Sequence, residues 1–202
     1  IISIISHSIG TKRFSLDKVF DELCYFAKFG NEELRRAGMY ALVKVTMESE
    51  AQIRDYIGDV VDAAVVPPLN AERITSLRPL IEQLIPQDVR LAANIFKNLL
   101  IVSSTLSNNG KHTIFGRLKP TARTIVKFAD HETRQELLKM APDLDRILAC
   151  MVVDAICHEA LFSLSTELDK TLELNIPGEI KETIIRYRYR QEREFGGKQW
   201  HQ

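Results

Sequence analysis

Cysteine is scarce in this chain of 202 residues, which contains only three. Cys24, Cys150 and Cys157 are too few and too far apart to form the disulfide framework of a small secreted domain. Each lies among apolar residues in a helical pattern, which is typical of a buried, reduced thiol. We therefore expect an intracellular protein of a reducing compartment, the cytoplasm or the nucleus.

Net charge is lacking as well, because 27 Lys and Arg residues balance 27 Asp and Glu residues. A chain without net charge has no global attraction to nucleic acid or to anionic membranes, although a local patch can supply one. The apolar run at the start, IISIISHSIG, is too short to span a bilayer. It also has no basic stretch before it, as a signal peptide would. We expect no membrane partner.

Glycine and proline number only nine and seven, and most of them stand between helical patterns. No low-complexity run or long linker divides the chain, and a hydrophobic content of 45 % is ordinary for a globular domain. One run, VVDAAVV at 60–66, resembles a buried strand. It has no second strand to pair with, so we predict a helix there.

Apolar residues recur at helical spacing along the rest of the chain, which predicts an all-α fold of about ten short antiparallel helices. The first predicted helix is 16–29, with Phe26 in its buried stripe and Gly30 at its end. Asn31 caps the second, which has Leu34 on its apolar face, and the third runs from a cap at Ser49 to Gly58. The others are 60–66; 70–85, which is broken or kinked at Pro79; 88–106; a helix that Pro120 opens after a turn at 107–110; 131–140; 144–164, which Asp143 caps; and 179–195.

None of these helices can bury its apolar face alone, so stacking in a bundle or solenoid is expected. We predict a single all-helical domain at 15–195, with units at about 15–69, 70–110 and 111–195. Residues 1–14 are predicted to be an N-terminal arm or the end of a preceding helix. The tail at 196–202 is predicted to be frayed.

One segment resembles the last helix of an armadillo repeat. The pattern of that helix is alanine, three residues, leucine, one residue, asparagine and leucine. Ala92, Phe96, Asn98 and Leu99 fall on it. In armadillo proteins a ladder of such asparagines holds an extended peptide, and here Asn98 alone can be assigned that role.

A second segment, GMYALVKV at 38–45, resembles the same helix less closely. Leu42 and Val45 match, whereas Gly38 replaces the alanine and Lys44 replaces the asparagine. The resemblance to armadillo and HEAT-type repeats covers about half the chain. It implies an armadillo/HEAT-like superhelix that acts as an interaction scaffold; an irregular helical bundle is the alternative arrangement.

Basic residues with no acid among them gather between 111 and 127. They are Lys111, Arg117, Lys119, Arg123 and Lys127, with His112 adding a partial charge. Lys119, Arg123 and Lys127 are spaced to line one helix face. Such a stripe suits an acidic partner protein, a second copy of the chain or the phosphates of RNA. The alternative is that acids from elsewhere in the fold neutralise it.

A second basic run, RYRYRQER at 186–193, alternates with aromatic residues, as in proteins that bind single-stranded nucleic acid. Its candidate contacts are Arg186, Tyr187, Arg190 and Arg193. The three arginines share one helix face with Glu182 and Glu194, which are close enough to pair with them. Tyr187 and Tyr189 lie about 200° apart on a helix and cannot form one stacking platform.

No motif indicates a catalytic, cofactor or metal site. The chain has no glycine-rich phosphate loop and no nucleophile elbow. Asp154 and His158 have the spacing of two metal ligands on a helix, but the neighbouring sequence supplies no further ligands. We therefore predict no catalytic residue, no cofactor and no metal.

The function predicted from the sequence is a non-catalytic protein-interaction or assembly scaffold that binds a partner protein, or itself, through helix faces. The first alternative is an RNA-binding helical domain that uses the stripe at 111–127 and the helix at 186–193. The second is a helical enzyme, for example a nuclease, whose site is assembled from distant residues.

Overall fold

The computed structural model describes residues 16–48, 53–160, 178, 181, 182 and 184–186. Within these ranges the chain forms helices and short connections and no strand, so the all-α prediction is confirmed. The elements are α2 Leu16–Phe29, α3 Glu32–Glu48, α4 Ile53–Val65, α5 Ala71–Ser76, α6 Arg78–Leu84, α7 Val89–Ser103, α8 Asn108–Phe128, α9 His131–Lys139, the 3₁₀ turn η2 Ala141–Asp143, and α10 Arg146–Ala160.

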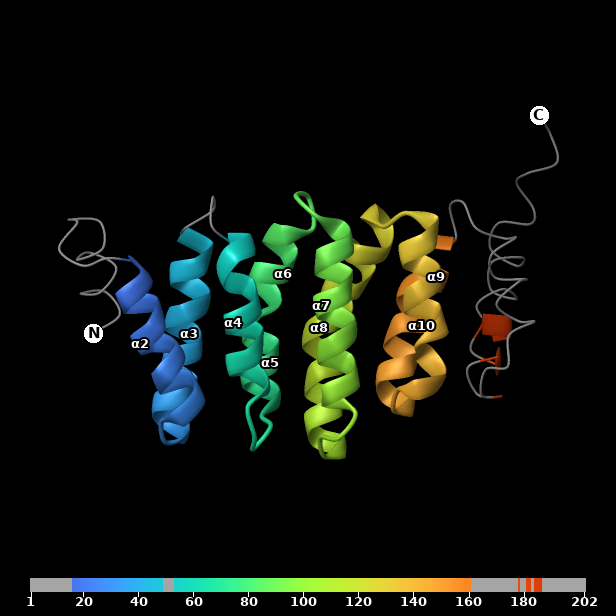
Figure 1. Cartoon of the computed structure of the whole chain (residues 1–202). Helices are drawn as coiled ribbons and strands as arrows, with labels where there is room; N and C mark the ends of the chain where they lie inside the picture. Colours follow the sequence, from blue (N-terminus) through green and yellow to red (C-terminus); the bar gives the residue numbers. More distant parts are fainter. Residues whose placement is uncertain (1–15, 49–52, 161–177, 179–180, 183, 187–202) are drawn as a thin grey trace.

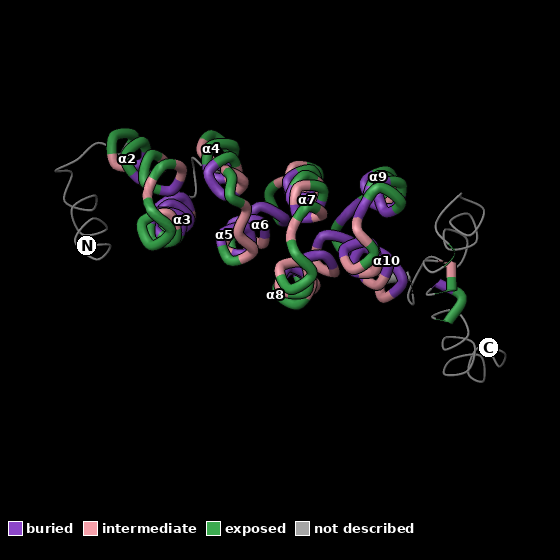
Figure 2. The backbone as a smooth tube through the Cα atoms, turned by 90° about the horizontal axis from the view of Figure 1, so that it is seen from below, coloured by how far each residue is buried: buried purple, intermediate pink, exposed green. Residues whose placement is uncertain are grey.

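The helices lie in two rows, and successive elements alternate between them (Figure 2). Helices α2, α4, α7 and α9 form one row, called here the A row. Helices α3, α5 with α6, α8 and α10 form the other, the B row. Neighbours contact each other more extensively in the B row than in the A row, and the contact between α8 and α10 is the largest.

Several predicted helix ends are confirmed. The Oδ1 atom of Asn31 accepts a hydrogen bond from the amide of Leu34 at 2.9 Å, which caps α3. Asp88 caps α7 in the same way, through the amide of Leu91 at 3.0 Å. The break predicted at Pro79 separates α5 from α6, and the proline stands in the first turn of α6.

Two predicted helix boundaries are wrong. Helix α4 continues through Gly58, because Ile57, Val60 and Ala64 keep one buried stripe in phase on both sides of the glycine. Helix α8 begins at Asn108 and carries Pro120 in its interior. The segment at 107–110 is therefore a helix start and no separate turn.

The start of α8 at the SNNG segment, 107–110, and its continuation to Pro120 each have a physical reason. The Oγ atom of Ser107 accepts from the amide of Gly110 at 3.3 Å and caps α8. Ile114 and Leu118 then extend the buried stripe as far as the proline. Pro120 itself is exposed, so its ring points away from the core. Packing on both sides thus outweighs the hydrogen bond that the proline cannot donate.

The cap predicted for the apolar helix α10 is also wrong by two residues. Asp143 belongs to the turn η2, and the cap is Asp145, whose Oδ1 atom accepts from the amide of Ile147 at 3.0 Å. The sequence offers aspartate at both positions, and the local pattern alone does not distinguish them. Leu144, between the two aspartates, is buried. Its burial holds η2 against the core, so α10 begins only after Asp145.

Other predictions lie wholly or partly outside the described residues: the arm at 1–14, the Ser49 cap, the C-terminal part of the helix at 144–164, and the tail at 196–202. Of the helix predicted at 179–195, residues 181, 182 and 184–186 are described and are helical. In the part of the chain that is described, no helix is long and apolar enough to cross a membrane.

Gly38 allows α2 and α3 to approach closely. A Cβ atom added to Gly38 would lie 2.9 Å from the backbone nitrogen of Ala27, which is shorter than any relaxed contact. Ala27 is itself fully buried, so α2 cannot shift without disturbing the core. Glycine at this position, where the armadillo pattern has alanine, is therefore required by packing.

We predict that Gly38→Ala lowers the free energy of unfolding by about 1–3 kcal/mol, because backbone strain exceeds the gain in helix propensity. The matched control is Gly58→Ala in α4, where nothing lies within 4 Å of the added Cβ. That variant should gain about 0.5–1 kcal/mol. Urea unfolding followed by circular dichroism measures both, and equal effects would contradict the predicted close approach.

Candidate interaction surface

All five basic residues of the predicted stripe lie on α8, which stands between α5–α6 and α10 in the B row (Figure 1). Three of them contact acids next to or on α10. The Nζ atom of Lys111 lies 2.8 Å from Asp145 Oδ2. Lys119 Nζ and Arg123 Nη2 lie 3.1 and 3.0 Å from the same atom, Asp154 Oδ2. For these three residues, acids from elsewhere in the fold do neutralise part of the stripe.

The contact between Lys111 and Asp145 is the most enclosed of these pairs, since the Lys111 side chain is only 11 % exposed. Burial acts to raise the pKa of Asp145. The hydrogen bonds from Lys111 and from the amide of Ile147 outweigh it, so the pKa is lowered on balance. Asp145 thus caps α10 and holds α8 beside it.

Positive charge remains in excess on this surface. Helix α8 carries five basic side chains and no acid, and two carboxylates are their ion-pair partners within the described residues. The Nη1 atom of Arg117 donates to the neutral hydroxyl of Thr75 at 3.3 Å. Lys127 Nζ lies over the ring of Phe128, 5.8 Å from its centroid. The two cations without a carboxylate partner in the described part are therefore Arg117 and Lys127.

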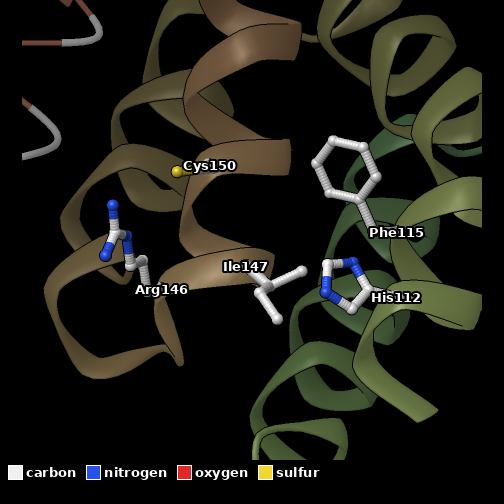
Figure 3. A pocket seen from close by; sticks show the side chains of 5 residues that line it. All are labelled: His112, Phe115, Arg146, Ile147 and Cys150. Atoms are coloured by element: carbon white, nitrogen blue, oxygen red, sulfur yellow. The ribbon is translucent and has the colours of Figure 1, made fainter. Parts of the chain in front are cut away.

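A pocket of about 240 Å³ opens between α8 and α10, beside these basic residues (Figure 3). His112 and Phe115 line it from α8, and Arg146, Ile147 and Cys150 line it from α10. Its walls are almost entirely apolar. No sequence pattern indicates this pocket, because its five lining residues come from two helices whose relative position depends on tertiary packing.

The cysteines differ from the prediction that all are buried. Cys157 is buried in the core, whereas Cys150 is half-buried and lines the pocket. The two cysteines are seven positions apart on α10, and only Cys150 stands in the N-terminal part of the helix that lines the pocket. Cys24 on α2 is also half-buried.

The remaining predicted site residues lie elsewhere or outside the described part of the chain. Asn98 is exposed on α7, in the A row. Arg186 pairs with Glu182 at 3.4 Å, as the sequence predicted. Tyr187, Arg190 and Arg193 lie outside the described residues. No group of three or more His, Cys, Asp or Glu side chains within the described ranges is arranged to hold a metal ion.

A second surface, missed by the sequence analysis, lies where α2 turns into α3. Tyr25, Phe26, Phe29 and Leu34 are all exposed there, and we call them the aromatic patch. The ring of Tyr25 lies 5.3 Å from Phe29 and 6.1 Å from Phe26. The prediction that Phe26 is buried is wrong, since it is 42 % exposed. Leu34, predicted on the apolar face of α3, is exposed as well.

We predict that Cys24 is modified faster than Cys157 in the native protein at pH 8. Burial raises the pKa of Cys157 to about 12 and that of Cys24 to about 11. Each pKa unit above pH 8 lowers the reactive thiolate fraction about tenfold, so both thiols react slowly. N-ethylmaleimide labelling followed by peptide mass mapping tests the order. Equally fast labelling of Cys157 would contradict the described burial.

No protein-family model, curated protein or solved structure matches this chain. The all-α class therefore stands on the structure alone. Membership of the armadillo or HEAT-type families stays a prediction, carried by the two sequence segments that resemble those repeats.

Proposed function

We propose that this chain is a non-catalytic protein-interaction domain that binds an acidic partner protein through the B-row face centred on α8. The observation that carries the proposal is the excess positive charge of α8 beside an apolar pocket. Charge of one sign attracts and orients a partner over a distance, whereas an apolar pocket supplies contact energy at short range. The two features together are typical of protein recognition.

RNA binding is the weaker alternative for the same surface. Affinity for RNA needs several cations available to phosphates and aromatic rings on which bases can stack. Lys111, Lys119 and Arg123 are already paired with carboxylates. On α8 the exposed ring is that of Phe128, and the rings of the aromatic patch lie at the α2–α3 turn, at the opposite end of the rows from α10 (Figure 1).

We predict that the double reversal Arg117→Glu with Lys127→Glu weakens binding of a fluorescein-labelled twelve-residue polyglutamate peptide about tenfold. These two cations have no carboxylate partner in the described part, so their reversal leaves the α8–α10 ion pairs intact. Fluorescence anisotropy at low and at moderate salt measures the affinity. A dodeca-uridine RNA is titrated in parallel.

The matched control is Lys97→Glu with Lys139→Glu, which makes the same change in net charge on A-row helices α7 and α9. It should bind the peptide almost as the wild type does. Loss of binding in both variants would mean that total charge, and no particular face, is responsible. Tighter binding of the RNA, lost only in the Arg117 and Lys127 variant, would favour the RNA-binding alternative.

Self-association is a second candidate function, and the aromatic patch favours it. Tyr25 and Phe29 are 62 % and 68 % exposed and lie in contact at the end of both rows. Contiguous exposed rings of this kind are costly in water and are typical of association surfaces. A second copy of the chain would cover them.

We predict that Phe29→Ser lowers the apparent molecular mass of a concentrated sample in size-exclusion chromatography with light scattering. Phe128→Ser is the matched control, because Phe128 is also strongly exposed but stands alone at the end of α8. Its removal should leave the mass unchanged. A wild-type protein that stays monomeric at the highest concentration reached would exclude this second role.

A further inference from the structure

We infer that the acidic partner of the α8 face is a second copy of this chain, which docks with the outer face of its helices α2 and α4. The inference rests on the proposed function, because it uses the same basic surface, and it names the partner. The charges of the two rows of helices are complementary, although the whole chain has no net charge.

Helices α2 and α4 of the A row carry an excess of negative charge, with six acidic residues against three basic ones. One of the basic residues, Arg54, is already paired with Asp88 before α7, at 3.5 Å. Asp55, Asp59 and Asp62 lie on one side of α4, within about 60° of each other around the helix. All three are exposed, and none of their side chains has a hydrogen-bond or ion-pair partner among the described residues.

Two carboxylates of α2 belong to the same side of the molecule. Burial raises the pKa of Cys24 to about 11, and the charges of Asp59 on α4 and Asp21 on α2 contribute to the increase. Both carboxylates therefore lie near one thiol. Asp17 of α2 accepts a hydrogen bond from the hydroxyl of Tyr56 on α4 at 2.5 Å. Helices α2 and α4 thus share one acidic surface, formed by the aspartates 17, 21, 55, 59 and 62.

The B-row face offers a counterpart of similar length. Arg117 and Lys127 both lie on the exposed side of α8, about 15 Å apart along the axis, and the aspartates of α4 extend over about 10 Å. Neither cation is paired with a carboxylate in the described part of the chain. Pro120 is exposed between them, and the space where a Cβ atom of Gly116 would stand is open. A second helix can therefore approach this side of α8 closely.

The two surfaces lie on opposite sides of the molecule, because α2 and α4 belong to the A row and α8 belongs to the B row (Figure 2). One copy therefore cannot pair them with each other. A contact between the acidic surface of one copy and the α8 face of the next leaves one surface of each kind free, so copies join head to tail in a ring or an open chain. A symmetric dimer through either surface would place like charges opposite each other, which disfavours it.

The test uses two double reversals in the full chain. Asp59→Arg with Asp62→Arg makes the acidic surface basic, and Arg117→Glu with Lys127→Glu makes the α8 face acidic. Each variant alone should raise the dissociation constant for self-association at least about tenfold, because it brings like charges together. An equimolar mixture of the two variants should associate as the wild type does, since each altered surface then meets a complementary one. Sedimentation velocity at low salt measures every sample.

The matched control is Glu136→Arg with Asp143→Arg, which makes the same charge change as the α4 variant at exposed positions outside both surfaces. It should associate as the wild type does. Added salt supplies a measurement on the wild type that depends on the folding of no variant. The association should weaken as salt is added, because ions screen exposed charges. The polyglutamate peptide should also dissociate the copies, because it occupies the same α8 face.

The possible results separate this inference from the proposed function. A wild-type chain that binds the polyglutamate peptide but stays monomeric at low salt would overturn the second copy as partner and leave the proposed function standing. Failure to bind the peptide as well would overturn both. Variants that remain monomeric when mixed, while the wild type associates, would overturn the pairing of these two surfaces. Association that strengthens with salt and is abolished by Phe29→Ser would assign self-association to the aromatic patch and also overturn the inference.

Discussion

The first two helix pairs depend on hydrogen bonds from two arginines to the carbonyls at the ends of A-row helices. Arg73 of α5 is only 1 % exposed, and its guanidinium donates to the carbonyls of Val66, at 2.9 Å, and Pro68 just beyond α4. Arg35 of α3 donates to Pro67 and to Lys28 near the end of α2. Carbonyls at helix C-termini have no hydrogen-bond donor within their own helix. The two arginines supply the donors and so join α3 to α2 and α5 to the end of α4. Burial, and then the neighbouring charge of Arg35, lowers the pKa of Arg73.

At the other end of the rows, the charges that hold the helices together lie on the surface that we propose for recognition. Asp154 accepts contacts from both Lys119 and Arg123, so one carboxylate joins α10 to two turns of α8. Such partly buried pairs depend on both partners, because a cation left alone there keeps its desolvation cost. The ion pairs consequently fix the spacing of α8 and α10, on which the pocket depends. Its five lining residues come together only in that register.

The sequence could predict features that depend on neighbours within a few residues. The caps at Asn31 and Asp88 and the break at Pro79 are of this kind. The sequence-based predictions were wrong at Gly58 and Pro120, where tertiary packing outweighs the local preference of the residue. They were also wrong at Phe26, which lies on α2 at the border between the buried and the exposed face of the helix. The ion pairs of α8 join residues more than 30 positions apart. The basic residues of the stripe could therefore be predicted from the sequence, whereas the acids that pair with them and the pocket could not.

Charge is almost absent from the interior of the described residues. Within the described residues, Arg73 is the only buried side chain that carries a charge, and it is bonded to backbone carbonyls. The other buried polar residues are hydroxyl-bearing; Thr46, for example, donates to the carbonyl of Leu42 at 2.8 Å, as threonines commonly do in helices. The larger part of the charge stands instead on outer helix faces, where it acts on whatever approaches them.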